Sequence, residues 1–141
     1  MRLLIVNGPN LNLIGQREQK IYGNRSFDDY LDLLKKEFEA VDIEYYQSNV
    51  EGELINTLQN STHDGILLNA GGYTHTGIAL HDCIKAISIP VIEIHISNVA
   101  AREDFRHTSK ITPVAVGCIL GLGLESYALG ISYFLNYSNS R

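Results

Sequence analysis

The segment from Val91 to Ser97 combines an apolar strand pattern with residue types that transfer protons. Its sequence, VIEIHIS, places Glu93, His95 and Ser97 on one strand face. Side chains two apart on such a face are roughly 6.5 Å apart along the chain and can converge. Burial of an unpaired carboxylate and imidazole is costly, so we expect the two to pair. The pair either serves a histidine general acid held in one tautomer or is only a satisfied polar contact in the core.

A second candidate for proton transfer is the pair Arg17 and Tyr22, in a polar loop that we predict over residues 10–23. Tyrosine titrates near 10 and is a poor base at neutral pH, but an adjacent guanidinium favours the phenolate. Lowering a pKa by about 2–3 units needs roughly 3–4 kcal/mol of preferential stabilisation. The alternative is a surface arginine and a loop tyrosine that only packs. Glycines bound the loop, so we expect it to act as a lid.

Further polar residues follow the predicted strands. They are Asn7, Asn10, Asn12, Asn69, Gly71, Gly72, His75, Arg102 and Arg106. Amides, imidazoles and guanidinium groups together favour a site for a polyhydroxylated, anionic small molecule. Arg102 and Arg106 are four residues apart, which predicts one helical face. They either bind the ligand or pair with the acidic residues between them.

These side chains are far apart in sequence, so the fold must bring them together. We predict strands over residues 3–6, 43–47, 66–69 and 91–96. We predict helices over about fourteen residues after a Ser26 cap, and over 51–60, 78–87 and 114–135, the last rich in glycine. The alternation predicts an α/β, flavodoxin-like, doubly wound parallel sheet with helices on both faces. The site then lies at the carboxyl ends of the strands. We expect a single catalytic domain over residues 1–141, with a frayed tail at 136–141.

Composition narrows the function classes. The 141 residues suit one domain, and a net charge of −5 disfavours nucleic-acid binding. Two cysteines are too few for a disulfide framework, which points to core thiols and a cytoplasmic location. We expect the apolar segment 114–135 to be buried in protein rather than to span a membrane. The spacing of histidines and cysteines matches no metal motif, and no nucleotide fingerprint is present, so we predict neither metal nor cofactor.

Five motifs together resemble type II 3-dehydroquinate dehydratase. They are NGPNLN at 7–12, GQRE at 15–18 with YG at 22–23, NAGGYTHT at 69–76, EIHISN at 93–98 and AREDFRH at 101–107. The similarity runs from about residue 2 to residue 137, in the same order and spacing. Members convert 3-dehydroquinate to 3-dehydroshikimate and water, in the shikimate pathway or in quinate breakdown, without metal, cofactor or Schiff base.

The resemblance implies a role for each matched residue in catalysis. Tyr22 is the base that removes a proton next to the ring ketone, and Arg17 lowers its pKa. Asn10 orients a water that stabilises the resulting enolate. His95, positioned by Glu93, then protonates the departing hydroxyl.

The resemblance also implies substrate-binding residues and an assembly. The residues are Asn69, His75, Asp82, Ile96, Ser97 and Arg106. Asn69 holds the substrate carboxylate together with the backbone amides of Ile96 and Ser97. His75 and Arg106 bind the ring hydroxyls. Asp82 reaches a neighbouring subunit's site. The family forms homo-oligomers, trimers packed into dodecamers. From the net charge and the expected burial of segment 114–135 we predict no nucleic-acid or membrane partner.

Two other interpretations compete with this resemblance. One is a flavodoxin-like protein that binds a flavin or nucleotide, but its first loop should then carry phosphate-cradling hydroxyls rather than Pro9, Leu11 and Leu13. The other is a scaffold without activity. The complete set of proton-transferring residues argues against that scaffold.

Overall fold

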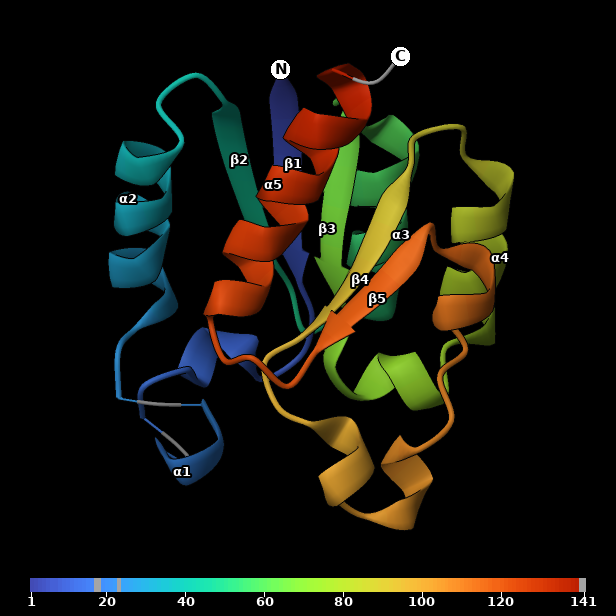
Figure 1. The fold of residues 1–141 in the computed structure, drawn as a ribbon. Coiled ribbons are helices and arrows are strands. Elements are labelled where there is room, and N and C mark those ends of the chain that lie inside the picture. Colours follow the sequence, from blue (N-terminus) through green and yellow to red (C-terminus); the bar gives the residue numbers. More distant parts are fainter. Residues whose placement is uncertain (17–18, 23, 140–141) are drawn as a thin grey trace.

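A five-stranded parallel sheet forms the centre of the molecule (Figure 1). The computed structural model describes residues 1–16, 19–22 and 24–139, and at residues 21, 22, 138 and 139 it describes the backbone alone. The strands are β1 (Arg2–Asn7), β2 (Asp42–Gln47), β3 (Gly65–Asn69), β4 (Val91–His95) and β5 (Gly117–Leu120). Their order is β2-β1-β3-β4-β5, and every neighbouring pair is parallel. The predicted doubly wound sheet is therefore confirmed.

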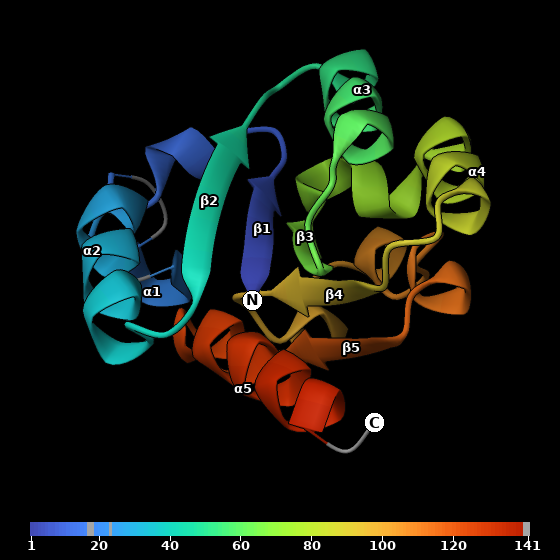
Figure 2. The same cartoon turned by 90° about the horizontal axis from the view of Figure 1, so that it is seen from above.

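Helices cover both faces of the sheet (Figure 2). They are α2 (Phe27–Glu37), α3 (Glu51–Asn60), α4 (Ile78–Ala86) and α5 (Glu125–Asn139), while the short helix α1 (Gln19–Tyr22) lies in the loop after β1 (Figure 1). One apolar core joins α2 and α5 to side chains such as Leu3 and Ile5 of β1. The other joins α3 and α4 to Leu4 and Val6 of the same strand. Successive residues of a strand point to opposite faces, so one apolar strand supplies both cores.

Helix α2 begins where the sequence predicts. The Ser26 hydroxyl accepts a hydrogen bond from the Asp29 amide at 3.1 Å, which satisfies one of the free amides of the first turn. The helix has 11 residues rather than about fourteen, because Phe38 leaves the helical conformation. The predicted helix over 51–60 is confirmed, and α4 ends one residue earlier than predicted.

The predicted helix over residues 114–135 is wrong. This segment contains strand β5, a turn and the first part of α5. Gly121 and Gly123 have φ angles of 86° and 65°, a left-handed conformation that ends the strand and precludes a continuous helix. A short apolar run does not by itself distinguish a buried strand from a helix.

Helix α5 continues through residues 136–139, inside the segment expected to be a frayed tail, and fraying of that tail stays a prediction. None of the helices in the described part of the chain is long and apolar enough to cross a membrane. The loop predicted over 10–23 contains a 3-10 helix at Leu11–Leu13 and the short helix α1.

Candidate active site

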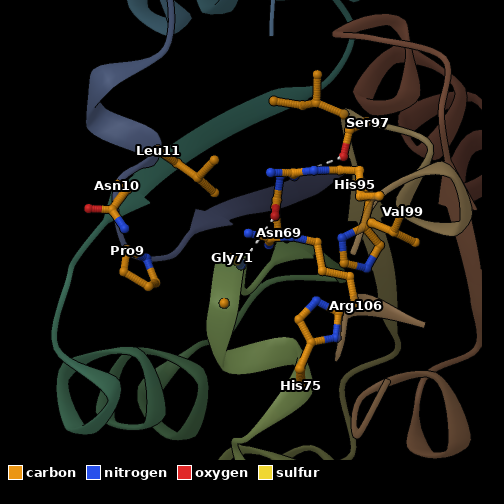
Figure 3. A pocket seen from close by; sticks show the side chains of 13 residues that line it. Pro9, Asn10, Leu11, Asn69, Gly71, His75, His95, Ser97, Val99 and Arg106 are labelled. Atoms are coloured by element: carbon orange, nitrogen blue, oxygen red, sulfur yellow. Dashed lines mark hydrogen bonds between the residues drawn. The ribbon is translucent and has the colours of Figure 1, made fainter. Parts of the chain in front are cut away.

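A pocket opens at the carboxyl ends of β1, β3 and β4, where an open parallel sheet places its ligands (Figure 3). Its lining residues are Pro9, Asn10, Leu11, Asn69, Gly71, Gly72, His75, His95, Ile96, Ser97, Val99, Arg102 and Arg106. The predicted residues Asn10, Asn69, His75, His95, Ile96, Ser97 and Arg106 are among them. The fold thus brings together side chains from three separate strand ends.

The imidazole of His95 contacts the carboxylate of Glu93 inside the protein. Nε2 of His95 is 3.0 Å from Oε2 of Glu93, and the two residues are 6% and 1% exposed. An ionised carboxylate only accepts hydrogen bonds, so the contact assigns the proton of the neutral ring to Nε2. Nδ1 is then the ring nitrogen left for a ligand in the pocket. The expected pairing of the two residues along β4 is confirmed.

Three further side chains bind the Glu93 carboxylate. Ser109 Oγ lies 2.6 Å from Oε1, Thr112 Oγ1 lies 3.1 and 2.9 Å from Oε1 and Oε2, and Cys118 Sγ lies 3.0 Å from Oε2. Burial raises the pKa of Glu93, but hydrogen bonds from His95, Cys118 and Ser109 lower it more, to about 2. Glu93 is therefore an anion at neutral pH.

Sequence reasoning missed these three partners because they are 16 to 25 residues away along the chain. The signal for Cys118 is the strand register, since β5 places Cys118 directly beside Glu93. That register was hidden by the incorrect helix prediction for this segment.

Glu93, His95 and Cys118 also form a cluster of metal-ligand types, with their ligand atoms all within 4.8 Å of one another. Motif spacing did not predict it. Burial and the neighbouring Glu93 raise the pKa of the Cys118 thiol to about 12. A metal ion binds the thiolate form of cysteine. The Cys118 thiol instead keeps its proton at neutral pH and donates a hydrogen bond to Glu93. The donor set therefore favours a hydrogen-bonded cluster over a cation site.

Asn69, at the end of β3, is held by a buried tyrosine. Its Nδ2 donates to Tyr127 Oη at 3.1 Å, and the Tyr127 hydroxyl donates to Asn7 Oδ1 at 2.7 Å. The Asn69 Oδ1 accepts the Gly71 amide at 3.2 Å. Tyr127 is 0% exposed and comes from α5, 58 residues further along the chain, so sequence reasoning did not find it. The network fixes the orientation of the Asn69 amide beside the pocket.

The pocket carries cationic and imidazole groups on one side, where Figure 3 shows His75, His95 and Arg106. Nδ1 of His75 is 2.8 Å from the Thr108 carbonyl oxygen, so Nδ1 carries the ring proton. Nε2 is then free to accept a hydrogen bond from a ligand.

The predicted common helical face of Arg102 and Arg106 is wrong. Arg102 follows the 3-10 helix Val99–Ala101, and Arg106 ends another at Asp104–Arg106. The pairing with an acidic residue is confirmed for Arg106, and ligand binding stays a prediction. Each lines the pocket, and Nε of Arg106 also pairs with Glu103 at 2.7 Å.

The described pocket lining does not contain three of the predicted residues, Arg17, Tyr22 and Asp82. Arg17 and the side chain of Tyr22 lie outside the described residues, although the backbone of Tyr22 ends α1. Asp82 lies on α4 and is not among the described residues that line this pocket. Its expected role in a neighbouring subunit's site is therefore untested.

Comparisons with known proteins agree on one family. The family model described as "Dehydroquinase class II" matches residues 1–135. The chain is 49% identical to a 3-dehydroquinate dehydratase of Fusobacterium nucleatum, over 99% of each chain. It is 50% identical to one of Trichodesmium erythraeum, over 99% of this chain and 95% of the other.

The solved structures give the same result. A type II dehydroquinase from Butyrivibrio crossotus superposes with a TM-score of 0.92 at 41% identity, over 95% of this chain and 97% of the other. A response regulator from Clostridium difficile, 16% identical with a TM-score of 0.53 over 99% of this chain and 98% of the other, shares the fold alone.

Proposed function

Since this chain belongs to the class II dehydroquinase family, we propose that it removes water from 3-dehydroquinate through the groups gathered at the strand ends. The observation that carries the proposal is the buried Glu93–His95 pair. Nε2 of the His95 imidazole is bound to the Glu93 carboxylate, and His95 lines a polar pocket. The product is 3-dehydroshikimate, as in the shikimate pathway.

The reaction begins with a base. The Tyr22 phenolate removes the proton next to the ring ketone, with Arg17 favouring the phenolate form. The electron pair of the C–H bond moves into the ring and the carbonyl oxygen becomes an enolate. A water oriented by Asn10, which lines the pocket, donates a hydrogen bond to that oxygen.

The second half needs an acid. As the enolate collapses, the bond to the β-hydroxyl breaks and the oxygen takes a proton from His95, leaving as water. A doubly protonated ring has one N–H for Glu93 and one for the leaving group. The negative charge of Glu93 stabilises that cationic ring, which supports an acid role for His95.

Substrate binding uses the polar lining of the pocket. The carboxylate of 3-dehydroquinate binds the amides of Ile96 and Ser97 together with Asn69, and His75 and Arg106 bind ring hydroxyls. The acceptor left on Nε2 of His75 suits a hydroxyl donor.

Assembly into trimers and dodecamers, with Asp82 at a neighbouring site, belongs to the same proposal. Apolar side chains exposed on and beside β5 and α5 support it, since such surface is costly on a monomer. They are Val116, Leu120, Leu122, Leu129 and Tyr133. Analytical ultracentrifugation tests the assembly, and a monomer would contradict it.

The decisive experiment follows the conjugated enone of the product by ultraviolet absorbance after 3-dehydroquinate is added. A rise that borohydride pretreatment leaves unchanged is expected, because no lysine imine takes part. Tyr22→Phe and His95→Ala should each nearly abolish turnover while the circular dichroism spectrum stays unchanged. Absence of turnover by the folded wild type would refute the proposed reaction, and an active Tyr22→Phe would refute the base.

A further inference from the structure

The hydroxyl of Ser109 has a single direction in which it can donate. Its oxygen accepts the amide N–H groups of Ile111 and Thr112, each at 3.0 Å. A hydroxyl has two lone pairs and one proton, so both acceptor positions are filled. The proton is left for Glu93 Oε1 at 2.6 Å. Such a contact requires an acceptor oxygen on the carboxyl group.

Thr112 completes the contact from the same turn. Its hydroxyl lies 3.1 Å from one carboxylate oxygen of Glu93 and 2.9 Å from the other. The segment carrying both hydroxyls is anchored, because the Lys110 amide donates to the Thr74 carbonyl at 2.7 Å and the Lys110 carbonyl is 2.6 Å from His81 Nδ1. The two hydroxyls are thus held in place before any ligand binds.

We propose that Ser109 and Thr112 are positioning residues for His95, whose hydroxyls keep Glu93 ionised and oriented toward the imidazole. The proposal rests on the proposed function, because it makes the acid role of His95 depend on two residues that never reach the substrate. In the described chain neither lines the pocket.

The charge of Glu93 depends on the groups that surround it. Among the described residues, the titratable groups that face it are His95 from its own strand and Cys118 from β5, while Leu68 of β3 is apolar. Burial alone opposes the charge of Glu93, and hydrogen bonds overcome it. Without the two hydroxyls only the contacts of His95 and Cys118 oppose burial, and we expect the pKa of Glu93 to rise above its ordinary value so that the carboxylate takes up a proton. A neutral Glu93 no longer stabilises a cationic ring, so His95 loses its support as an acid.

The test compares pH profiles of kcat. In the double variant Ser109→Ala/Thr112→Val we expect the acid limb of the kcat–pH profile to lie between about pH 5 and pH 7. This is at least about one pH unit above the acid limb of the wild type. At pH 6 we expect kcat to fall about tenfold or more and KM to change less than about threefold. Thr112→Val alone, which keeps the backbone contacts of Ser109, should show a smaller shift in the same direction. Ser109→Thr, which retains the hydroxyl, should keep the kcat–pH profile of the wild type.

The matched control is Thr57→Val on helix α3, which removes a hydroxyl that donates to the Glu53 carbonyl oxygen of the same helix at 2.8 Å. Its pH profile should match that of the wild type. Profiles of the double and single variants that are parallel to the wild type, lowered equally at every pH, would overturn the proposal and leave a merely structural role.

A second readout does not depend on turnover. In the wild type the lowered pKa of Glu93 gives stability that is present above about pH 4.5 and lost as the pH falls toward 2. In the double variant a raised pKa reverses the sign, so stability falls as pH rises above 4.5. The Tm gap between the two should widen from pH 4 to pH 7. A constant gap overturns the proposal, whereas absent wild-type turnover with a widening gap overturns the proposed function alone.

Discussion

Replacement of Tyr127 by phenylalanine tests the network that orients Asn69. The change removes one oxygen from a side chain that is 0% exposed. That oxygen donates to Asn7 Oδ1 at 2.7 Å and accepts from Asn69 Nδ2 at 3.1 Å. The substitution therefore leaves Asn7 Oδ1 and Asn69 Nδ2 without this hydrogen-bond partner and changes little of the apolar packing.

The expected magnitude follows from where those two groups lie. Asn7 is 0% exposed, so its abandoned oxygen bears the full penalty of about 1–3 kcal/mol. Asn69 is 3% exposed beside the pocket, and we assign its unpaired Nδ2 about 1 kcal/mol. The sum is about 2–4 kcal/mol, which lowers the Tm of a chain of this size by about 8–15 °C. A looser Asn69 should also raise KM several-fold more than it lowers kcat.

The assay is urea unfolding followed by circular dichroism, together with steady-state kinetics. Tyr133→Phe is the matched control on the same helix, because that ring is 40% exposed. The control should stay within about 0.5 kcal/mol of the wild type. A Tyr127→Phe variant as stable as the control would refute the reasoning that the hydroxyl is the essential partner of both amides.

Four other substitutions give distinct outcomes. Gly130→Ala should lower Tm, because the new Cβ would lie 2.6 Å from Leu67 Cδ2 and overpacking of about 1–3 kcal/mol exceeds roughly 1 kcal/mol of helix propensity. Gly52→Ala, with nothing within 4 Å of the new Cβ, should raise Tm instead, and equal shifts by calorimetry would contradict the packing argument. Glu93→Gln should lower kcat about 10²–10³-fold with little change in KM, and an unchanged kcat in the absorbance assay would exclude its support of the acid. Ser26→Ala should cost about 1 kcal/mol in urea unfolding through the lost helix cap, and no loss would mean that water replaces it.

Local patterns are enough for much of this fold. The apolar run of β1, the Ser26 cap and the helix over 51–60 follow from period, propensity and capping, which involve residues close in sequence. The strand-end rule then places His95 and Asn69 in one pocket, because parallel strands end at the same edge of the sheet.

The segment after residue 114 shows where this reasoning fails. A glycine-rich apolar run satisfies either a buried strand or a helix, and hydrogen bonding to β4 decides between them. Because the strand was missed, Cys118 could not be placed beside Glu93, and the effect of the thiol on the carboxylate was missed too.

Residue types and strand patterns were enough to predict the kinds of group at the site and the edge of the sheet at which they meet. Alternation along β4 was sufficient to pair Glu93 with His95, since both groups belong to one strand. The groups that hold Glu93, His95 and Asn69 in place become visible in the folded chain alone. Ser109, Cys118 and Tyr127 reach the site through strand register and helix packing, and the energy of those contacts depends on burial that no local pattern encodes.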